Sequence, residues 1–159
     1  MAEQECLEQA KEVYEVLCRT LDEMQWEYTK NEEILHVSVK TPEAVIRRRF
    51  GLMVNQKNAV VSLVLLMPFP VPKEKQREMA LAINLLNNSL HYGSFLYALD
   101  ERCLYYRVTN GFLDCKLGEG LFERMIRLSV VIIDDYYTQL EALASDEMTL
   151  EAFIDKLSL

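Results

Sequence analysis

The chain has 159 residues, of which 50% are hydrophobic and 26% are charged. That length suits a single domain that buries roughly 70% of its unfolded surface and needs neither disulfides nor metal for stability. There are 17 basic and 25 acidic side chains, so the net charge is −8. Phosphate backbones repel a chain this acidic, and we expect no nucleic-acid partner.

Cysteine and histidine are too scattered to predict a metal site. None of the four cysteines forms a C-x-x-C pair, and His36 and His91 each stand alone. On one predicted helix, Cys6 and Cys18 would lie about 18 Å apart by rise and could not bridge. We therefore expect free thiols in a reducing compartment and no cofactor.

The sequence predicts no signal peptide and no membrane-spanning segment. The first residues are polar and acidic, unlike a signal peptide. The longest apolar run, Ala59 to Val71, is interrupted by prolines and falls short of the ~20 residues needed to span a bilayer. We expect a cytoplasmic protein without a membrane partner.

The first predicted element is a helix over Glu3 to Met24. Its apolar residues recur at steps of three and four, which places them on one stripe: Leu7, Ala10, Tyr14, Leu17, Leu21 and Met24. A coiled-coil seam is one interpretation, but fewer than four heptads make it the weaker one. Packing against a sheet of the same chain is favoured.

After Met24 the period changes to two residues, which predicts strands. Two strands flank the polar turn Lys30 to Glu33, and two more, Ala44 to Val54 and Ala59 to Met67, flank the turn Asn55 to Asn58. In the simplest closure of that second turn, Val54 pairs with Ala59 and Phe50 with Leu63.

The remaining chain predicts helices and one more hairpin. These elements are a helix over Lys73 to Leu90, strands over Gly93 to Leu99 and Arg102 to Val108, a helix over Leu121 to Leu143, and a short helix over Thr149 to Leu157. The long helix would bury Leu121, Met125, Leu128, Ile132, Tyr136 and Leu140. Strands grouped in hairpins, in the order α-ββββ-α-ββ-α-α, predict an α+β fold with an antiparallel sheet packed against helices. We place one domain over 1–143 and a C-terminal helical extension over 144–159.

Strand alternation assigns the side chains of each hairpin to two faces. A turn at Asp100-Glu101 pairs Tyr97 with Leu104 and Phe95 with Tyr106, which puts bulky residues, Leu99 included, on one buried face. In the first hairpin the bulky face would carry Ile46, Arg48, Phe50, Leu52, Val54, Val61, Leu63 and Leu65.

The opposite face mixes aliphatic residues with Arg and Tyr, which are enriched at protein interfaces. Our candidate interface residues are Arg49, Val64, Leu96, Tyr105 and Arg107. Two interpretations stay open: this face binds another polypeptide, or a helix of the same chain covers it.

The last predicted helix is a candidate docking helix. Leu150, Phe153, Ile154 and Leu157 fall at i, i+3, i+4 and i+7, and Thr149 can cap its start. One hypothesis is a regulatory module in which this helix switches between its own domain and a partner.

No catalytic motif is present. The chain has no G-x-S-x-G, H-E-x-x-H, Walker A or Gly-rich dinucleotide sequence. Asp134 and Asp135 are adjacent on a helix and so point about 100° apart. An enzyme would need a pocket that gathers His36 or His91 with carboxylates from distant segments, and we expect none.

Several segments in order resemble a known family. They are Met67-Pro68-Phe69-Pro70-Val71-Pro72, then Ile83-Asn84-Leu85-Leu86-Asn87, then the hairpin from Gly93 to Arg107, and the helix end Asp134-Asp135-Tyr136-Tyr137. Over Leu7 to Leu143 the chain resembles the YbjN-like family of bacterial proteins, whose fold is similar to that of class I type III secretion chaperones.

That resemblance implies a small cytoplasmic protein that binds polypeptides, commonly as a homodimer, without known catalysis. Asn84 and Asn87 would have structural roles. The sequence therefore predicts a non-catalytic protein-binding or chaperone-like module with itself or a protein client as partner.

Overall fold

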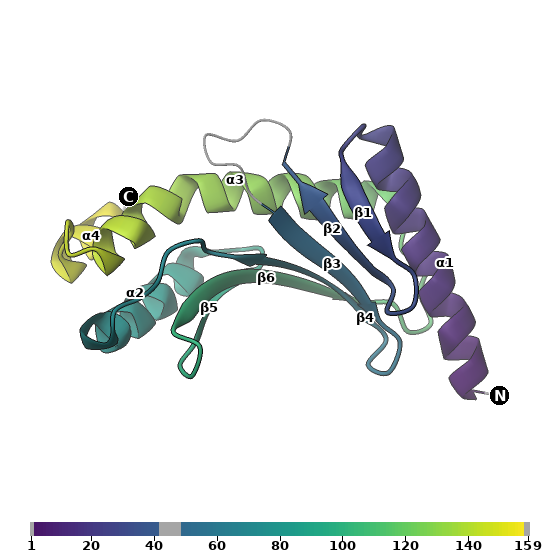
Figure 1. Ribbon diagram of the computed structural model, residues 1–159, viewed down its shortest axis with the longest axis horizontal. Coiled ribbons are helices and arrows are strands. Elements are labelled where there is room, and N and C mark those ends of the chain that lie inside the picture. Colours follow the sequence, from purple (N-terminus) through teal and green to yellow (C-terminus); the bar gives the residue numbers. More distant parts are fainter. Residues whose placement is uncertain (1, 42–48, 158–159) are drawn as a thin grey trace. The chain divides into compact units, whose positions relative to one another are not determined.

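A computed structural model of the protein describes residues 2–41 and 49–157 (Figure 1). The helices are α1 (Ala2–Glu23), α2 (Gln76–Ser89), α3 (Glu119–Ala144) and α4 (Leu150–Leu157), and the short 3-10 turn η1 (Lys73–Lys75) leads into α2. The strands are β1 (Tyr28–Asn31), β2 (His36–Lys40), β3 (Arg49–Asn55), β4 (Val60–Leu66), β5 (Ser94–Ala98) and β6 (Cys103–Gly111). The predicted α+β fold and its element order are confirmed.

The strands form one sheet in the order β1-β2-β3-β4-β6-β5. The pairs β1–β2, β2–β3, β3–β4 and β5–β6 are antiparallel, as their hairpin connections require. The chain groups into two compact units, Met1–Leu65 with Val108–Leu128, and Leu66–Arg107 with Ser129–Leu159. Compactness alone does not show which part folds by itself, so the expected division at residues 143 and 144 stays a prediction.

In the first unit, α1 lies along the inner face of β1–β3 (Figure 1). The predicted stripe is its contact surface, because Ala10, Leu17 and Leu21 are fully buried. Tyr14 Oη donates to the carbonyl of His36 at 3.3 Å, and Tyr28 Oη donates to the Asp22 carboxylate at 2.7 Å. Packing against the chain's own sheet is thus the observed role of α1.

In the second unit, aromatic side chains fill the space between the sheet and the helices. Phe95 meets Tyr106 edge to face at 5.1 Å between ring centroids, and Phe69 meets Tyr137 at 5.5 Å. Gly93 has φ +68°, and a Cβ there would overlap the Tyr106 ring, so only glycine fits. This close approach lets Tyr106 Oη donate to the Tyr92 carbonyl at 2.8 Å.

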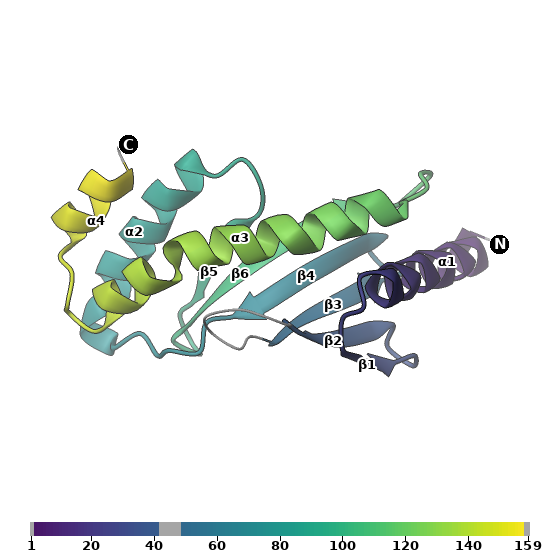
Figure 2. The same cartoon turned by 90° about the horizontal axis from the view of Figure 1, so that it is seen from above.

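Two helices of the second unit, α2 and α4, lie side by side (Figures 1 and 2). Phe153 of α4 is fully buried, and the amide of Ala152 donates to Thr149 Oγ1 at 3.2 Å. The predicted cap at Thr149 is therefore present. On α2, the Asn87 amide donates to the Phe95 carbonyl and accepts from the Phe95 amide, both at 2.9 Å, whereas Asn84 is exposed.

Three expectations about local structure are wrong. Val54 pairs with Val61 and Leu52 with Leu63, because the turn extends to Ala59, which adopts φ +49°. Leu99 is 65% exposed in its turn. Along α3 the buried line is rotated by about one residue from the expected stripe; its members are Phe122, Met125, Ile126, Ser129, Ile133, Tyr137 and Leu140.

The two hairpins otherwise follow the predicted alternation. The expected pairs Tyr97 with Leu104 and Phe95 with Tyr106 are confirmed. Phe50, Leu52, Val54, Val61, Leu63 and Leu65 are all buried, as expected for the bulky face. The start of the strand predicted from Ala44, with Ile46 and Arg48, lies outside the described residues.

Candidate protein-binding surfaces

The sheet of the first unit has one face that its helices leave open. Along β3 and β4 buried residues alternate with exposed or half-buried ones. Met53 is 43% exposed and Val64 is 38% exposed, although both are apolar. We call this surface the first outer face, made of His36, Ser38, Lys40, Arg49, Gly51, Met53, Ser62, Val64 and Thr109.

Within this face the side chains are fixed by register. Gly51 pairs with Val64 and Met53 with Ser62. The hydroxyls of Ser62 and Thr109 are 3.0 Å apart and bond to each other. A Cβ at residue 51 would lie 2.7 Å from His36 Nε2, so the missing side chain of Gly51 makes room for the imidazole. The centre of the face thus exposes the apolar side chains of Met53 and Val64 beside the paired hydroxyls of Ser62 and Thr109.

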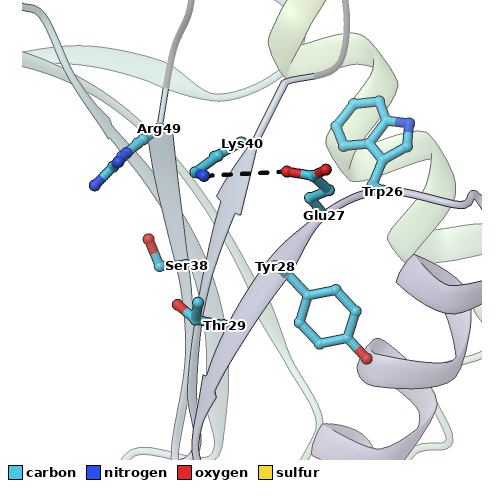
Figure 3. A pocket seen from close by; sticks show the side chains of 7 residues that line it. All are labelled: Trp26, Glu27, Tyr28, Thr29, Ser38, Lys40 and Arg49. Atoms are coloured by element: carbon cyan, nitrogen blue, oxygen red, sulfur yellow. Dashed lines mark ion pairs between the residues drawn. The ribbon is translucent and has the colours of Figure 1, made fainter.

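At one end of the first outer face lies an open cavity of about 570 Å³. It is lined by Trp26, Glu27, Tyr28, Thr29, Ser38, Lys40 and Arg49 (Figure 3). Lys40 and Arg49 are direct register partners on β2 and β3. The Lys40 ammonium reaches the Glu27 carboxylate at 4.0 Å, whereas the Arg49 side chain extends away from that pair (Figure 3).

The second unit has an open sheet face of its own. We call it the second outer face, made of Ser94, Leu96, Ala98, Cys103, Tyr105 and Arg107. Leu96 is the register partner of Tyr105, and Arg107 is the partner of Ser94. Leu96 and Tyr105 are half-buried and Arg107 is exposed. Among the predicted interface residues, Leu96, Tyr105 and Arg107 thus belong to one surface, and Arg49 and Val64 belong to the other.

Sequence reasoning missed Lys40, Met53 and the cavity. Alternation could have found the two cations, because Lys40 and Arg49 both occupy outward positions at the ends of consecutive strands. It could not find the cavity, because the register between β2 and β3 depends on the connection between them. Alternation also places Met53 on the same face as Arg49, four residues earlier on β3, so its position could have been found from the sequence.

A second missed feature is a cluster of polar side chains between α1 and β1. Tyr14, Cys18 and Asp22 line an open cavity of about 480 Å³ together with Lys30 and Leu35. Burial raises the pKa of Tyr14 to about 12. Burial likewise raises the pKa of the Cys18 thiol, which is the opposite of the change that activates a thiol nucleophile.

The docking helix residues lie on α4. Phe153 is fully buried, and Leu150, Ile154 and Leu157 are half-buried. At the turn before α4, Asp146 pairs with Lys75, which also pairs with Glu78 of α2 at 2.9 Å. In this structure α4 is therefore docked on its own unit.

Within 2–41 and 49–157, no group of three His, Cys, Asp or Glu side chains is placed to hold a metal ion. Over the same ranges no helix combines the length and the apolar character needed to cross a bilayer.

Two proteins of similar fold are among the solved structures that match the chain. E. coli YbjN, described as "a putative transcription regulator", has 14% sequence identity and a TM-score of 0.57; the match covers 84% of this chain and 92% of that chain. A chain from the HopA1-SchA chaperone–effector complex has 11% identity and a TM-score of 0.51, covering 79% of this chain and 90% of that one. The chaperone-like fold is thus confirmed.

Sequence comparison identifies a family. No curated protein matches the chain. The model of the family YbjN, described as "Putative bacterial sensory transduction regulator", matches residues 14–142, most of the chain. The chain therefore belongs to the YbjN family.

Proposed function

We propose that this protein is a non-catalytic, chaperone-like module that binds other polypeptides through its outer sheet faces. The observation that carries the proposal is the pair Leu96 and Tyr105, an aliphatic and an aromatic side chain that are register partners and stay only half-buried. Aromatic and Arg side chains are the usual anchors of protein interfaces, and Arg107 lies on the same face.

The family and the fold support this proposal. The family's description is that of a regulator, and one protein of similar fold comes from a chaperone–effector complex. The cysteines Cys6, Cys18, Cys103 and Cys115 are free, which suits a reducing cytoplasm, where we place the protein.

We further propose that the protein is a homodimer formed through the second outer face. A symmetric dimer places the same patch on both subunits, so Leu96 and Tyr105 would bury each other across a two-fold axis. Leu96→Asp with Tyr105→Asp would then insert charges into an apolar contact and prevent association.

Light scattering coupled to size-exclusion chromatography tests this prediction. The wild type should have the mass of two chains and the double variant the mass of one, with unchanged far-UV circular dichroism. Leu99→Asp is the matched control, because Leu99 is 65% exposed in the adjacent turn and should stay dimeric. A double variant that keeps the wild-type mass and still binds client proteins would show that this surface is the wrong one.

A second candidate function is regulation by α4. The observation that favours it is that this short helix buries Phe153 against α2, a contact that a partner's apolar groove could replace.

A further inference from the structure

The first outer face carries a more specific inference, which rests on the proposed function. We propose that this face binds an acidic, apolar segment of another polypeptide. A carboxylate of the segment would lie against Lys40 and Arg49, and its apolar side chains would cover Met53 and Val64.

Lys40 and Arg49 form a pair of neighbouring cations on the first outer face. Lys40 and Arg49 are directly opposite each other on an antiparallel pair and point to the same face. Like charges in that position repel and weaken the pair. Glu27 offsets this only for Lys40, at 4.0 Å and largely exposed to water. Among the described residues no carboxylate pairs with Arg49, whose guanidinium has the geometry to bind a carboxylate through two hydrogen bonds.

The charge of the first outer face is opposite in sign to the net charge of the chain. The chain has a net charge of −8. Yet the outward positions of the described strand residues of the first unit carry no Asp or Glu, and their charged residues are Lys40 and Arg49. An acidic partner would therefore meet attraction on this face and repulsion over much of the remaining surface.

The centre of the first outer face exposes two apolar side chains, Met53 and Val64. Met53 and Val64 keep 43% and 38% of their surface exposed, and Ser62 and Thr109 satisfy each other's hydroxyls. Arg49 and Met53 are four residues apart on β3, about 13 Å at strand rise. A short extended segment can thus place a carboxylate at the cations and an apolar side chain on Met53. A second copy suits this face less well, since it would present the same cations.

A peptide selection tests the proposal. A randomised peptide library on phage is selected against the wild type, Arg49→Glu and Lys57→Glu. Lys57 is an exposed cation in the β3–β4 turn and serves as the charge-matched control. The wild type and the control should enrich peptides rich in Asp or Glu together with Leu, Ile, Val or Phe. A selected peptide should bind at least about tenfold more weakly to Arg49→Glu and to Met53→Asp, and more weakly in high salt.

The other possible results of these experiments would contradict different parts of the proposal. Enriched peptides that are basic or neutral, or equal affinity for the wild type and Arg49→Glu, would overturn this inference and leave general polypeptide binding standing. No enriched peptide at all would overturn the proposed function itself. Stronger binding of RNA or of vesicles containing phosphatidylglycerol than of the selected peptides would assign the cations to another ligand. Sedimentation showing that Met53→Asp splits a dimer would assign this face to a second copy.

Discussion

One side-chain amide, that of Asn87, replaces a backbone partner for Phe95. Its nitrogen donates to the carbonyl and its oxygen accepts from the amide of the same residue, both at 2.9 Å. The sequence indicated a structural role for both helix asparagines, and the structure gives this role to Asn87 alone. Asn84 is exposed, and nothing in the structure explains it.

Replacing Asn87 with Ala should lower the free energy of unfolding by about 2–3 kcal/mol, because two partly buried backbone groups lose their partners. Urea unfolding monitored by circular dichroism measures this. Asn84→Ala, on the exposed side of the same helix, should change stability by less than about 0.5 kcal/mol. Equal effects of the two substitutions would contradict the assigned role.

Individual candidate residues were predictable to different degrees. The pairing of Leu96 with Tyr105 followed from the short turn at Asp100-Glu101, which leaves little freedom of register. Arg49 was chosen as a candidate interface residue, but its register partner Lys40 was not, because no short turn fixes the pairing of β2 with β3. Local spacing alone does not fix the register of two strands that no short turn joins.

At the scale of elements, α4 allows a direct test of the regulatory candidate. Ending the chain after Ser145 removes α4 and exposes the apolar residues of α2 that it covers. Binding of an environment-sensitive apolar dye should rise several-fold, and the shortened chain should keep the circular dichroism of the other helices. Glu151→Ala in the full chain, an exposed position on α4, is the control. Unchanged dye fluorescence in the shortened chain would count against a releasable helix.

The two hairpins show why one register was predictable and the other was not. The β5–β6 turn is short, and the register derived from it is confirmed. The β3–β4 turn runs on through Ala59 at φ +49°, a conformation that alanine seldom adopts, so spacing alone placed the closure too early. Because the error was an even shift, every side chain still fell on the correct face.

The long helix α3 shows a different limit. Its buried line includes Ser129, which is 1% exposed and contributes a side-chain hydrogen bond to Tyr106. A prediction based on apolar spacing excludes a helix face that contains serine, and it therefore selects the neighbouring stripe of apolar residues. The expected stripe is therefore displaced by about one residue, because apolar spacing does not recognise a buried serine whose hydroxyl bonds a residue far along the chain.

At the scale of the whole molecule, buried tyrosines predict a loss of stability in alkali. Burial raises the pKa of Tyr14 to about 12 and that of Tyr106 to about 12, against an ordinary value of 10.0. The unfolded chain therefore loses these protons first. The contribution of these two groups to the free energy of unfolding is fully present below pH 10.0. It falls as the pH rises towards 12, by about 1.4 kcal/mol per pH unit for each group.

Urea unfolding at a series of pH values checks this, with tyrosinate absorbance recorded in parallel. Tyr106→Phe should lower stability at neutral pH, because the hydroxyl's bond to the Tyr92 carbonyl is lost, yet flatten the alkaline slope. Should all tyrosines of the folded protein titrate together near the ordinary value, the assignment of these two as buried acids would be wrong.

The overall fold was predictable and the binding surfaces were partly so. Periods of two and of three to four residues are local properties, and they gave the elements, their order and the open face of each hairpin. The cavity beside Arg49 is lined by residues from Trp26, between α1 and β1, to the start of β3. Its existence depends on tertiary placement, which no local period contains.

The bond between Asn87 and Phe95 has a consequence for crowded conditions. β5 is the last strand of its sheet, and an uncapped terminal strand offers its peptide groups as a template for a neighbouring molecule. Here the backbone groups of Phe95, near the start of that strand, are already bonded to a side chain from α2. The strand of a second molecule would have to displace Asn87 to pair with β5 at Phe95, which hinders edge-to-edge association there.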